Sequence, residues 1–201
     1  IFTGKWADTS QVIDEIGLLN RGTGASSAGE LVVLGWSPDI SGSNFWEELA
    51  SVELGSANAT IDSGTITAKK YLWFQVYCAG STANNRCHIR MNSLSTGIYS
   101  DRYSTNGSAD STDINSGSAR ISNINDLLPK FVNGFIVNNS SSEKLGIASE
   151  VSQNTAGAGT SPQRTESVFK IATNDLVTSI QIINLSGNWS AGSVLTVWGS
   201  D

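Results

Sequence analysis

The chain has 201 residues, of which 12 are basic and 18 acidic, and its formal net charge at pH 7 is −6. Only 15% of the residues are charged, and Ser, Thr, Asn and Gly are abundant. This composition excludes helical bundles and coiled coils, which are rich in Ala, Leu, Glu, Lys and Arg. The excess of acidic residues excludes a protein that binds the phosphate backbone of nucleic acids, because such proteins have clusters of Lys and Arg. No apolar run reaches the roughly 18 residues that a membrane-spanning helix needs.

Short strand-like segments, separated by clusters of Gly, Ser, Asn and Asp, follow one another along the chain. In chain order we predict strands at 12–19, 30–34, 47–54, 65–67, 71–78, 88–91, 98–103, 131–138, 144–151, 168–172, 177–184 and 194–198. Segment 71–78 (YLWFQVYC) has the composition of a central strand that is buried on both faces. About a dozen short strands with turn signals between them predict an all-β fold, an antiparallel β-sandwich or jelly roll. At most one short helix is predicted, near 121–128, where Ser122 is the N-cap candidate.

The beginning of the chain is similar to its end. IGLLN at 16–20 aligns with IQIIN at 180–184, a spacing of 164 residues, and in both places an Ala-Gly pair and a strand closing in Gly follow. Ordered similarity of this kind indicates a tandem repeat. We therefore interpret 1–39 as the C-terminal strands of a preceding repeat, 40–45 as a polar linker and 46–201 as a complete domain. Because the sequence lacks an initiating Met, we expect it to begin partway through a longer polypeptide. The alternative is that both stretches are similar hairpins of one sandwich.

The sequence offers no arrangement typical of catalysis, a cofactor site or a metal site. The single histidine, His88, directly follows Cys87 on a predicted strand. Neighbouring strand residues point to opposite faces, so these two side chains do not form a catalytic dyad. Motifs of serine hydrolases, nucleotide-binding loops, zinc proteases and EF-hands are missing from the sequence. We predict that the protein is not an enzyme and binds no cofactor or metal. A glycosidase remains a third hypothesis, and it requires a pair of catalytic carboxylates.

Cys78 and Cys87 flank a turn-rich segment, so a hairpin brings them together. Two buried, reduced thiols are the preferred interpretation, and a disulfide is the alternative.

Four residues form the candidate ligand surface. Trp189 lies in a polar loop, and Tyr99, Arg102 and Tyr103 belong to a segment that ends in an Asn-Gly turn. Aromatic rings stack on sugars, so a carbohydrate-binding module or receptor-binding adhesin is one candidate function. Trp73 and Trp198 lie in apolar segments and are expected in the core.

Four motifs, taken in order, resemble a known family. They are YSTNGSAD at 103–110, FIVNN at 135–139 followed by EKL at 143–145, GAGTSPQRTE at 157–166, and AGS at 191–193 with its closing strand and Gly199. In this order they are similar to the repeated jelly-roll domains of virion structural proteins of tailed bacteriophages. The resemblance spans nearly all of 46–201, and its last part recurs in 1–39.

The resemblance implies a non-enzymatic role on the surface of a phage particle, as a capsid decoration protein, head fibre or tail fibre. Its implied partners are other virion proteins and copies of itself, with a host-surface glycan as a further candidate. Nucleic acid and membrane insertion are not expected. The implied location is the virion, assembled in the host cytoplasm, where a reducing environment favours free thiols.

Overall fold

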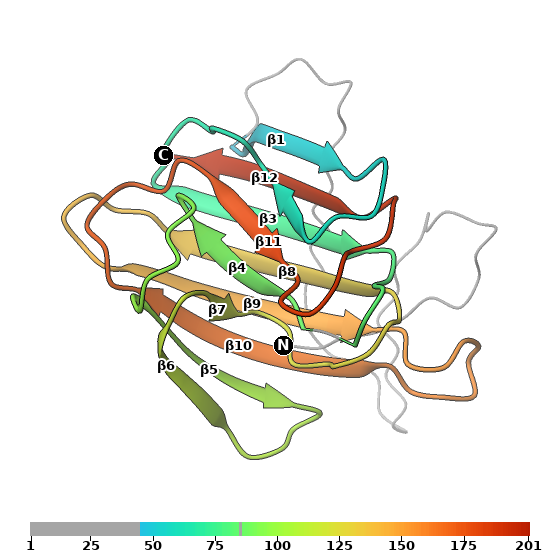
Figure 1. Ribbon diagram of the computed structural model, residues 1–201. Helices are drawn as coiled ribbons and strands as arrows, with labels where there is room; N and C mark the ends of the chain where they lie inside the picture. Colours follow the sequence, from blue (N-terminus) through green and yellow to red (C-terminus); the bar gives the residue numbers. More distant parts are fainter. Residues whose placement is uncertain (1–44, 85) are drawn as a thin grey trace, which may run out of the picture. The chain divides into compact units, whose positions relative to one another are not determined.

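The computed structural model describes residues 45–84 and 86–201, and these form two antiparallel β-sheets (Figure 1). The strands are β1 (Glu47–Glu53), β2 (Thr60–Asp62), β3 (Tyr71–Cys78), β4 (His88–Met91), β5 (Tyr99–Thr105), β6 (Ser111–Ser116), β7 (Ala119–Arg120), β8 (Lys130–Val137), β9 (Lys144–Ser152), β10 (Gln163–Ile171), β11 (Ile180–Ile183) and β12 (Val194–Ser200). The predicted all-β class is therefore confirmed. The predicted strands at 12–19 and 30–34, with the interpretation of 1–39 as part of a preceding repeat, lie outside the described residues.

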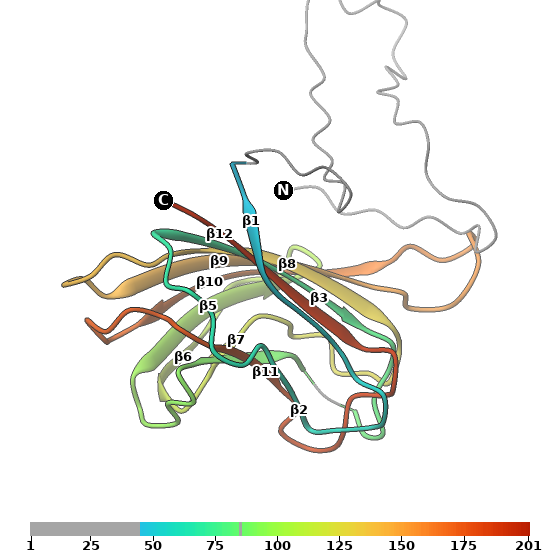
Figure 2. The ribbon, with the colours of Figure 1, turned by 90° about the horizontal axis from the view of Figure 1, so that it is seen from above.

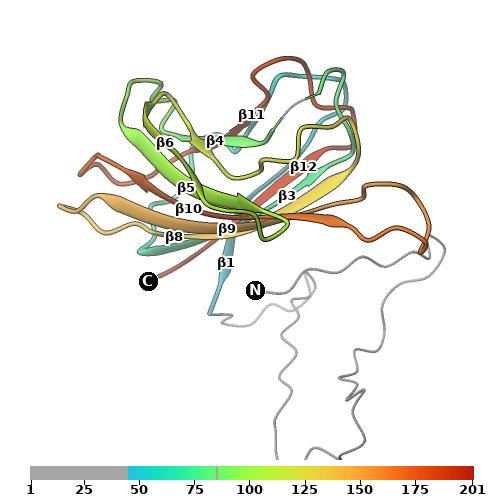
Figure 3. The same cartoon turned by 90° about the horizontal axis from the view of Figure 1, so that it is seen from below.

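The two sheets differ in size. The larger has eight strands in the order β1-β12-β3-β8-β9-β10-β5-β6, and the smaller has four in the order β2-β11-β4-β7. Figure 2 shows them as two layers, and Figure 3 shows the large sheet curving around the small one. Chain neighbours such as β3 and β4 lie in different sheets, so the chain crosses between the layers repeatedly. The arrangement is that of a β-sandwich.

The core lies between the sheets. It forms because every second side chain of a strand points inward. In β3, Leu72, Phe74 and Val76 are fully buried, and the residues between them are not. Apolar side chains from both sheets meet these three, among them Ile89, Met91, Val132, Ile180, Ile182, Leu195 and Val197. Burying each such side chain stabilises the fold by roughly 1.5–3 kcal/mol.

Two glycines give the aromatic core residues their space. A Cβ atom on Gly134 of β8 would lie 2.3 Å from the Phe74 ring, and one on Gly146 of β9 would lie 2.1 Å from the Phe169 ring. Each glycine therefore lets a phenylalanine ring lie flat across the neighbouring strand.

The prediction of at most one short helix is confirmed, because no helix occurs among the described residues and the candidate segment 121–128 is irregular. Ser122 does not cap a helix. Its hydroxyl donates to Glu150 Oε1 at 2.5 Å inside the core. The Lys130 ammonium group donates to the Ile124 carbonyl at 2.7 Å. In a helix over 121–128 this carbonyl would instead accept a backbone hydrogen bond. Tertiary partners thus override the local capping signal.

Three short strands differ from the prediction. The expected strand at 65–67 is a loop, and the strand of that region is β2, three residues long. The strands β6 and β7 were not expected from sequence. β6 is rich in hydroxyl groups and has one large apolar residue, Ile114, which is 71% exposed. It lies at the sheet edge, where no alternating apolar pattern is needed.

Candidate binding face

The residues Tyr99, Arg102 and Tyr103 all lie on β5, and Arg102 and Tyr103 border one shallow depression, whereas Tyr99 does not reach the surface. Tyr99 is fully buried, and its hydroxyl donates to the Leu94 carbonyl at 3.0 Å. Its expected exposure is therefore wrong. The OH group also accepts from the Met91 amide at 2.9 Å, so Tyr99 is a core residue whose polar end is satisfied by backbone.

Tyr103 also points between the sheets. The Arg120 guanidinium lies 4.5 Å from its ring centroid, and Arg120 forms an ion pair with Asp113 at 2.6 Å. This cation–π contact holds the Tyr103 ring within the fold.

Trp189 is fully buried, so its predicted place on the surface is wrong. Its backbone forms isolated bridges with Asn58 and Ser81. The loop around it is polar, but the indole belongs to the core cluster. The polar residues around Trp189 in the sequence led to the prediction of an exposed ring. In the structure the ring packs in the core between the sheets.

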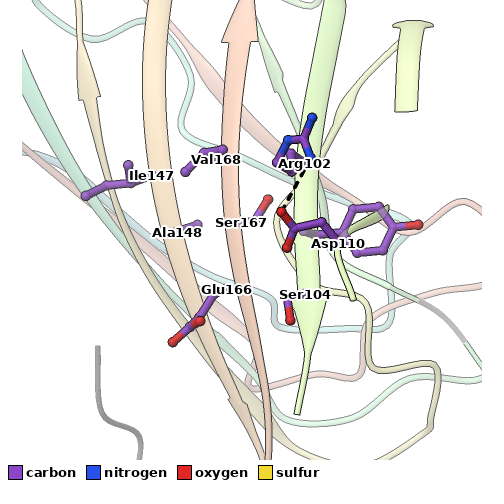
Figure 4. A pocket seen from close by; sticks show the side chains of 9 residues that line it. Arg102, Ser104, Asp110, Ile147, Ala148, Glu166, Ser167 and Val168 are labelled. Atoms are coloured by element: carbon purple, nitrogen blue, oxygen red, sulfur yellow. Dashed lines mark hydrogen bonds and ion pairs between the residues drawn. The ribbon is translucent and has the colours of Figure 1, made fainter. Parts of the chain in front are cut away.

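Arg102 is the one member of the predicted set that faces outward. It forms an exposed ion pair with Asp110 at 3.4 Å. Figure 4 shows this pair beside a shallow depression, which Ile147 and Val168 also line. An exposed pair of this kind is worth about 0–1 kcal/mol, so its charge stays available to a partner.

The outward side of the large sheet carries the feature that the sequence did not reveal. We call the outward-pointing residues of its central strands β3, β8 and β9 the outer face. They are Tyr71, Trp73, Gln75, Tyr77, Phe131, Asn133, Phe135, Val137, Leu145, Ile147, Ser149 and Val151. None of them is charged, and most are large and apolar. Leu145 is 58% exposed and Ile147 48%.

The prediction that 71–78 is buried on both faces is therefore wrong for the described residues. The small sheet covers one side of β3, while Tyr77 on the other side is 46% exposed. The strand nonetheless has the composition of a doubly buried one. Large exposed apolar patches are uncommon on monomeric soluble proteins.

Aromatic rings are concentrated at one end of the outer face. Trp73 stacks on Trp198 with ring centroids 4.3 Å apart, and on Phe135 at 6.0 Å. Trp46 packs edge-on against Trp73 at 6.0 Å. Trp46 and Phe135 border a shallow hollow with Tyr71 and Leu145. The expected burial of Trp198 is confirmed, since it is 6% exposed, although neighbouring rings cover it on the outward side. Trp73 is only partly buried on the outer face, so its predicted place in the core is wrong.

Charged groups border the outer face on both sides. On β1, Glu48 pairs in register with Trp198 and Glu53 pairs with Val194. Beyond β9, on the opposite side, three outward cations form ion pairs with nearby carboxylates: Arg164 with Glu166, Arg102 with Asp110, and Lys170 with Glu143. An uncharged aromatic centre with a charged rim is the anatomy of a protein–protein interface.

The interior holds polar groups that serve the fold. Lys130 is 2% exposed and lies 3.2 Å from Asp126 Oδ1 and 3.9 Å from Glu150 Oε1. Burial raises the pKa of Glu150, while the charge of Lys130 opposes that shift.

His88 lies against the hydroxyl of Ser118, with Nδ1 3.2 Å from Oγ. Burial, followed by the charge of Arg120, lowers its pKa to about 4. The imidazole is therefore neutral at pH 7.

Cys78 and Cys87 are both buried and free, with their sulfur atoms 3.6 Å apart. Hydrogen bonding to Cys87 and burial raise the pKa of the Cys78 thiol. In the part of the chain that the structure describes, no group of three or more His, Cys, Asp and Glu side chains is placed to hold a metal ion. Nor do residues 45–84 and 86–201 contain a helix long and apolar enough to cross a membrane.

Comparisons with models of protein families and with curated protein sequences find no match to this chain.

Proposed function

We propose that this protein is a non-enzymatic structural protein of a bacteriophage virion, which acts through protein–protein contacts of its β-sandwich. The observation that carries the proposal is the uncharged, aromatic outer face. A protein that worked only through its loops would gain nothing from twelve outward positions without a single charge, and such a surface promotes association.

The strand order supports the jelly-roll part of the proposal. Without the hairpins β5–β6 and β9–β10, the two sheets read β1-β12-β3-β8 and β2-β11-β4-β7. In this order the first and last strands pair, and each sheet alternates early and late strands, as in a double Greek key. The two hairpins then extend the larger sheet at one side.

The motifs that resemble the phage domains lie at turns and strand ends of this fold. The first contains the Asn106-Gly107 turn between β5 and β6, where both residues have positive φ (53° and 76°). The third contains the last part of the connection from β9 to β10 and the start of β10. This placement fits a repeated surface module on the particle.

The experiment that tests the proposed function is peptide mass spectrometry of purified phage particles from a culture that expresses the gene, with immunogold labelling of the same particles. We expect the chain in the particle fraction and gold on the particle surface. Its absence from particles, with the protein present in the host lysate, would contradict the proposal.

A glycan-binding role is the second candidate, and the aromatic hollow favours it. Trp46, Tyr71 and Phe135 line the hollow, and exposed rings of this kind stack on sugars. A glycan array separates the candidates. Specific binding that Tyr71→Ala abolishes would favour an adhesin, and Trp189→Ala is not an informative variant because Trp189 is in the core.

A further inference from the structure

The outer face is continued by residue rows that run across the large sheet. One row follows the register from Glu48 through Trp198, Trp73, Phe135, Ile147 and Val168 to Arg102. Paired residues of adjacent strands lie side by side on one face. The row is thus apolar throughout its middle, acidic at one end and basic at the other.

A second row has the same polarity. It begins at Glu53 and passes through Val194, Tyr77, Phe131 and Val151 to Arg164. Glu48 and Glu53 are exposed, and neither forms an ion pair with another described residue. The β1 side of the face is therefore negative, whereas the opposite side carries cations with partly exposed partners.

We propose that a second copy of this chain binds face to face on the outer face, with the two-fold axis running along β8. This inference rests on the proposed function, because it names the partner for those protein contacts. Rotation about an axis parallel to the strands reverses each row in the second copy. Glu48 of one copy then lies opposite Arg102 of the other, and the reverse pair forms by symmetry.

Charge decides this orientation. An axis across the strands would place the Glu48 and Glu53 side of one copy over the same acidic side of the other, and like charges brought together in this way repel. The parallel axis instead places Glu48 of one copy over Arg102 of the other, whose guanidinium already forms an exposed ion pair with Asp110. The strand order fixes the position of the axis. The first row runs from Glu48 on β1 to Arg102 on β5, and β8 is the middle strand of those that it crosses.

The axis also predicts which residues meet their own copies. Phe135 lies on β8 and points outward with 39% exposure, so it faces Phe135 of the second copy. Trp73 then faces Ile147. The contact at the centre is aromatic and uncharged, as in the well-packed centres of homodimer interfaces.

A charge-swap series on the full 201-residue chain tests the orientation. Glu48→Arg and Arg102→Glu should each raise the dimer dissociation constant about tenfold, because two symmetry-related pairs become repulsive. The double variant should return it to within about threefold of the wild-type value. Raised salt should weaken the single-variant effects, since the groups are exposed. A double variant that is worse than both single variants would overturn the proposed orientation.

A cross-linking experiment tests the axis without relying on affinity. Phe135→Cys, oxidised with glutathione disulfide, should form a covalent dimer on a non-reducing gel: two cysteine thiols and one glutathione disulfide give the inter-chain disulfide and two glutathione thiols. Leu185→Cys is the matched control, because Leu185 is 56% exposed and follows β11 of the small sheet. It should stay monomeric on the gel. Equal cross-linking of both variants, or none by Phe135→Cys, would overturn the placement of the axis.

The outcomes also separate this inference from the proposed function. A wild-type chain that is monomeric at all concentrations but present on particles would overturn self-association through this face and leave the virion role standing. A dimer that is absent from particles would support the face and contradict the virion role.

Discussion

Trp73 and Trp198 stack with ring centroids 4.3 Å apart and planes 26° from parallel, as a register pair on the outward side of β3 and β12. Trp73 also stacks on Phe135 of β8. Ring stacking thus links β12, β3 and β8 on the side of the large sheet that the small sheet does not cover.

Removal of the Trp73 ring should weaken the sheet. We expect Trp73→Ala to lower the free energy of unfolding by about 2–3 kcal/mol, because ring stacking adds roughly 0.5–1.5 kcal/mol to the loss of buried area. Tyr77→Ala, on the same strand and the same face, should cost less than about 1 kcal/mol because Tyr77 is already half exposed. Urea unfolding at a concentration where the chain is monomeric measures both. Equal decreases in the free energy of unfolding for the two variants would contradict a stabilising contribution from ring stacking.

The flat packing of Phe74 depends on Gly134. Gly134→Ala should destabilise the protein by about 2–3 kcal/mol, because the added methyl group overlaps the ring and the core cannot yield freely. Gly146→Ala should act in the same way through Phe169. Gly159→Ala is the control, since its Cβ would meet nothing within 4 Å. Thermal unfolding compares the three, and a neutral Gly134→Ala would refute the packing argument.

The buried pair Lys130 and Glu150 should behave as a coupled unit. Lys130→Met leaves the buried carboxyl without its cation and should cost about 3 kcal/mol. Glu150→Gln alone should cost about 1–2 kcal/mol through the disturbed hydrogen bond from Ser122. The double variant should cost less than the sum of the two, and a double-mutant cycle by urea unfolding measures the difference. Strict additivity would contradict a direct interaction.

His88 and Asp101 should make stability depend on pH in opposite directions. Burial, with the charge of Arg120, lowers the pKa of His88 to about 4, so its contribution is complete above the unfolded pKa of about 6.5 and is lost as the pH falls towards 4. Burial raises the pKa of Asp101 to about 6 despite the hydrogen bond from the Arg120 amide. Its carboxyl therefore favours the folded state at low pH, and this contribution is lost as the pH rises from about 4 to 6.

Two variants separate these opposing effects. Relative to the wild type, His88→Gln should gain stability as the pH falls from about 6.5 to 4, by about 2 kcal/mol. Asp101→Asn should instead gain as the pH rises from about 4 to 6, by a similar amount. Urea midpoints at pH 4, 5, 6 and 7 provide the test. Parallel pH curves for all three proteins would contradict the effect of burial on the pKa of these two side chains.

The sequence predicted those parts of the fold in which local pattern and burial agree. Segments such as 71–78 and 144–151 alternate or carry dense β-branched and aromatic residues, and both are strands. β6 was missed because an edge strand exposes both sides of its hydroxyl-rich sequence. The candidate helix after Ser122 does not form because Glu150, distant in sequence, binds the hydroxyl that would cap it.

The binding face was harder to predict than the strands. Trp189 and Tyr99 were candidates because polar neighbours surround them in sequence, but the fold buries both. Conversely, Leu145 and Ile147 looked like ordinary strand residues. Only the register of β3, β8 and β9 shows that their outward sides form one uncharged face. One signal was present in the sequence: β3 has the composition of a strand with two buried sides.

Sedimentation velocity of the full chain measures whether the outer face is an association surface. We expect a species of twice the chain mass for the wild type and for Leu185→Lys, and a monomer for the double variant Leu145→Lys/Ile147→Lys, with circular dichroism showing that all three are folded. A folded Leu145→Lys/Ile147→Lys variant that sediments as the wild type does would contradict this expectation.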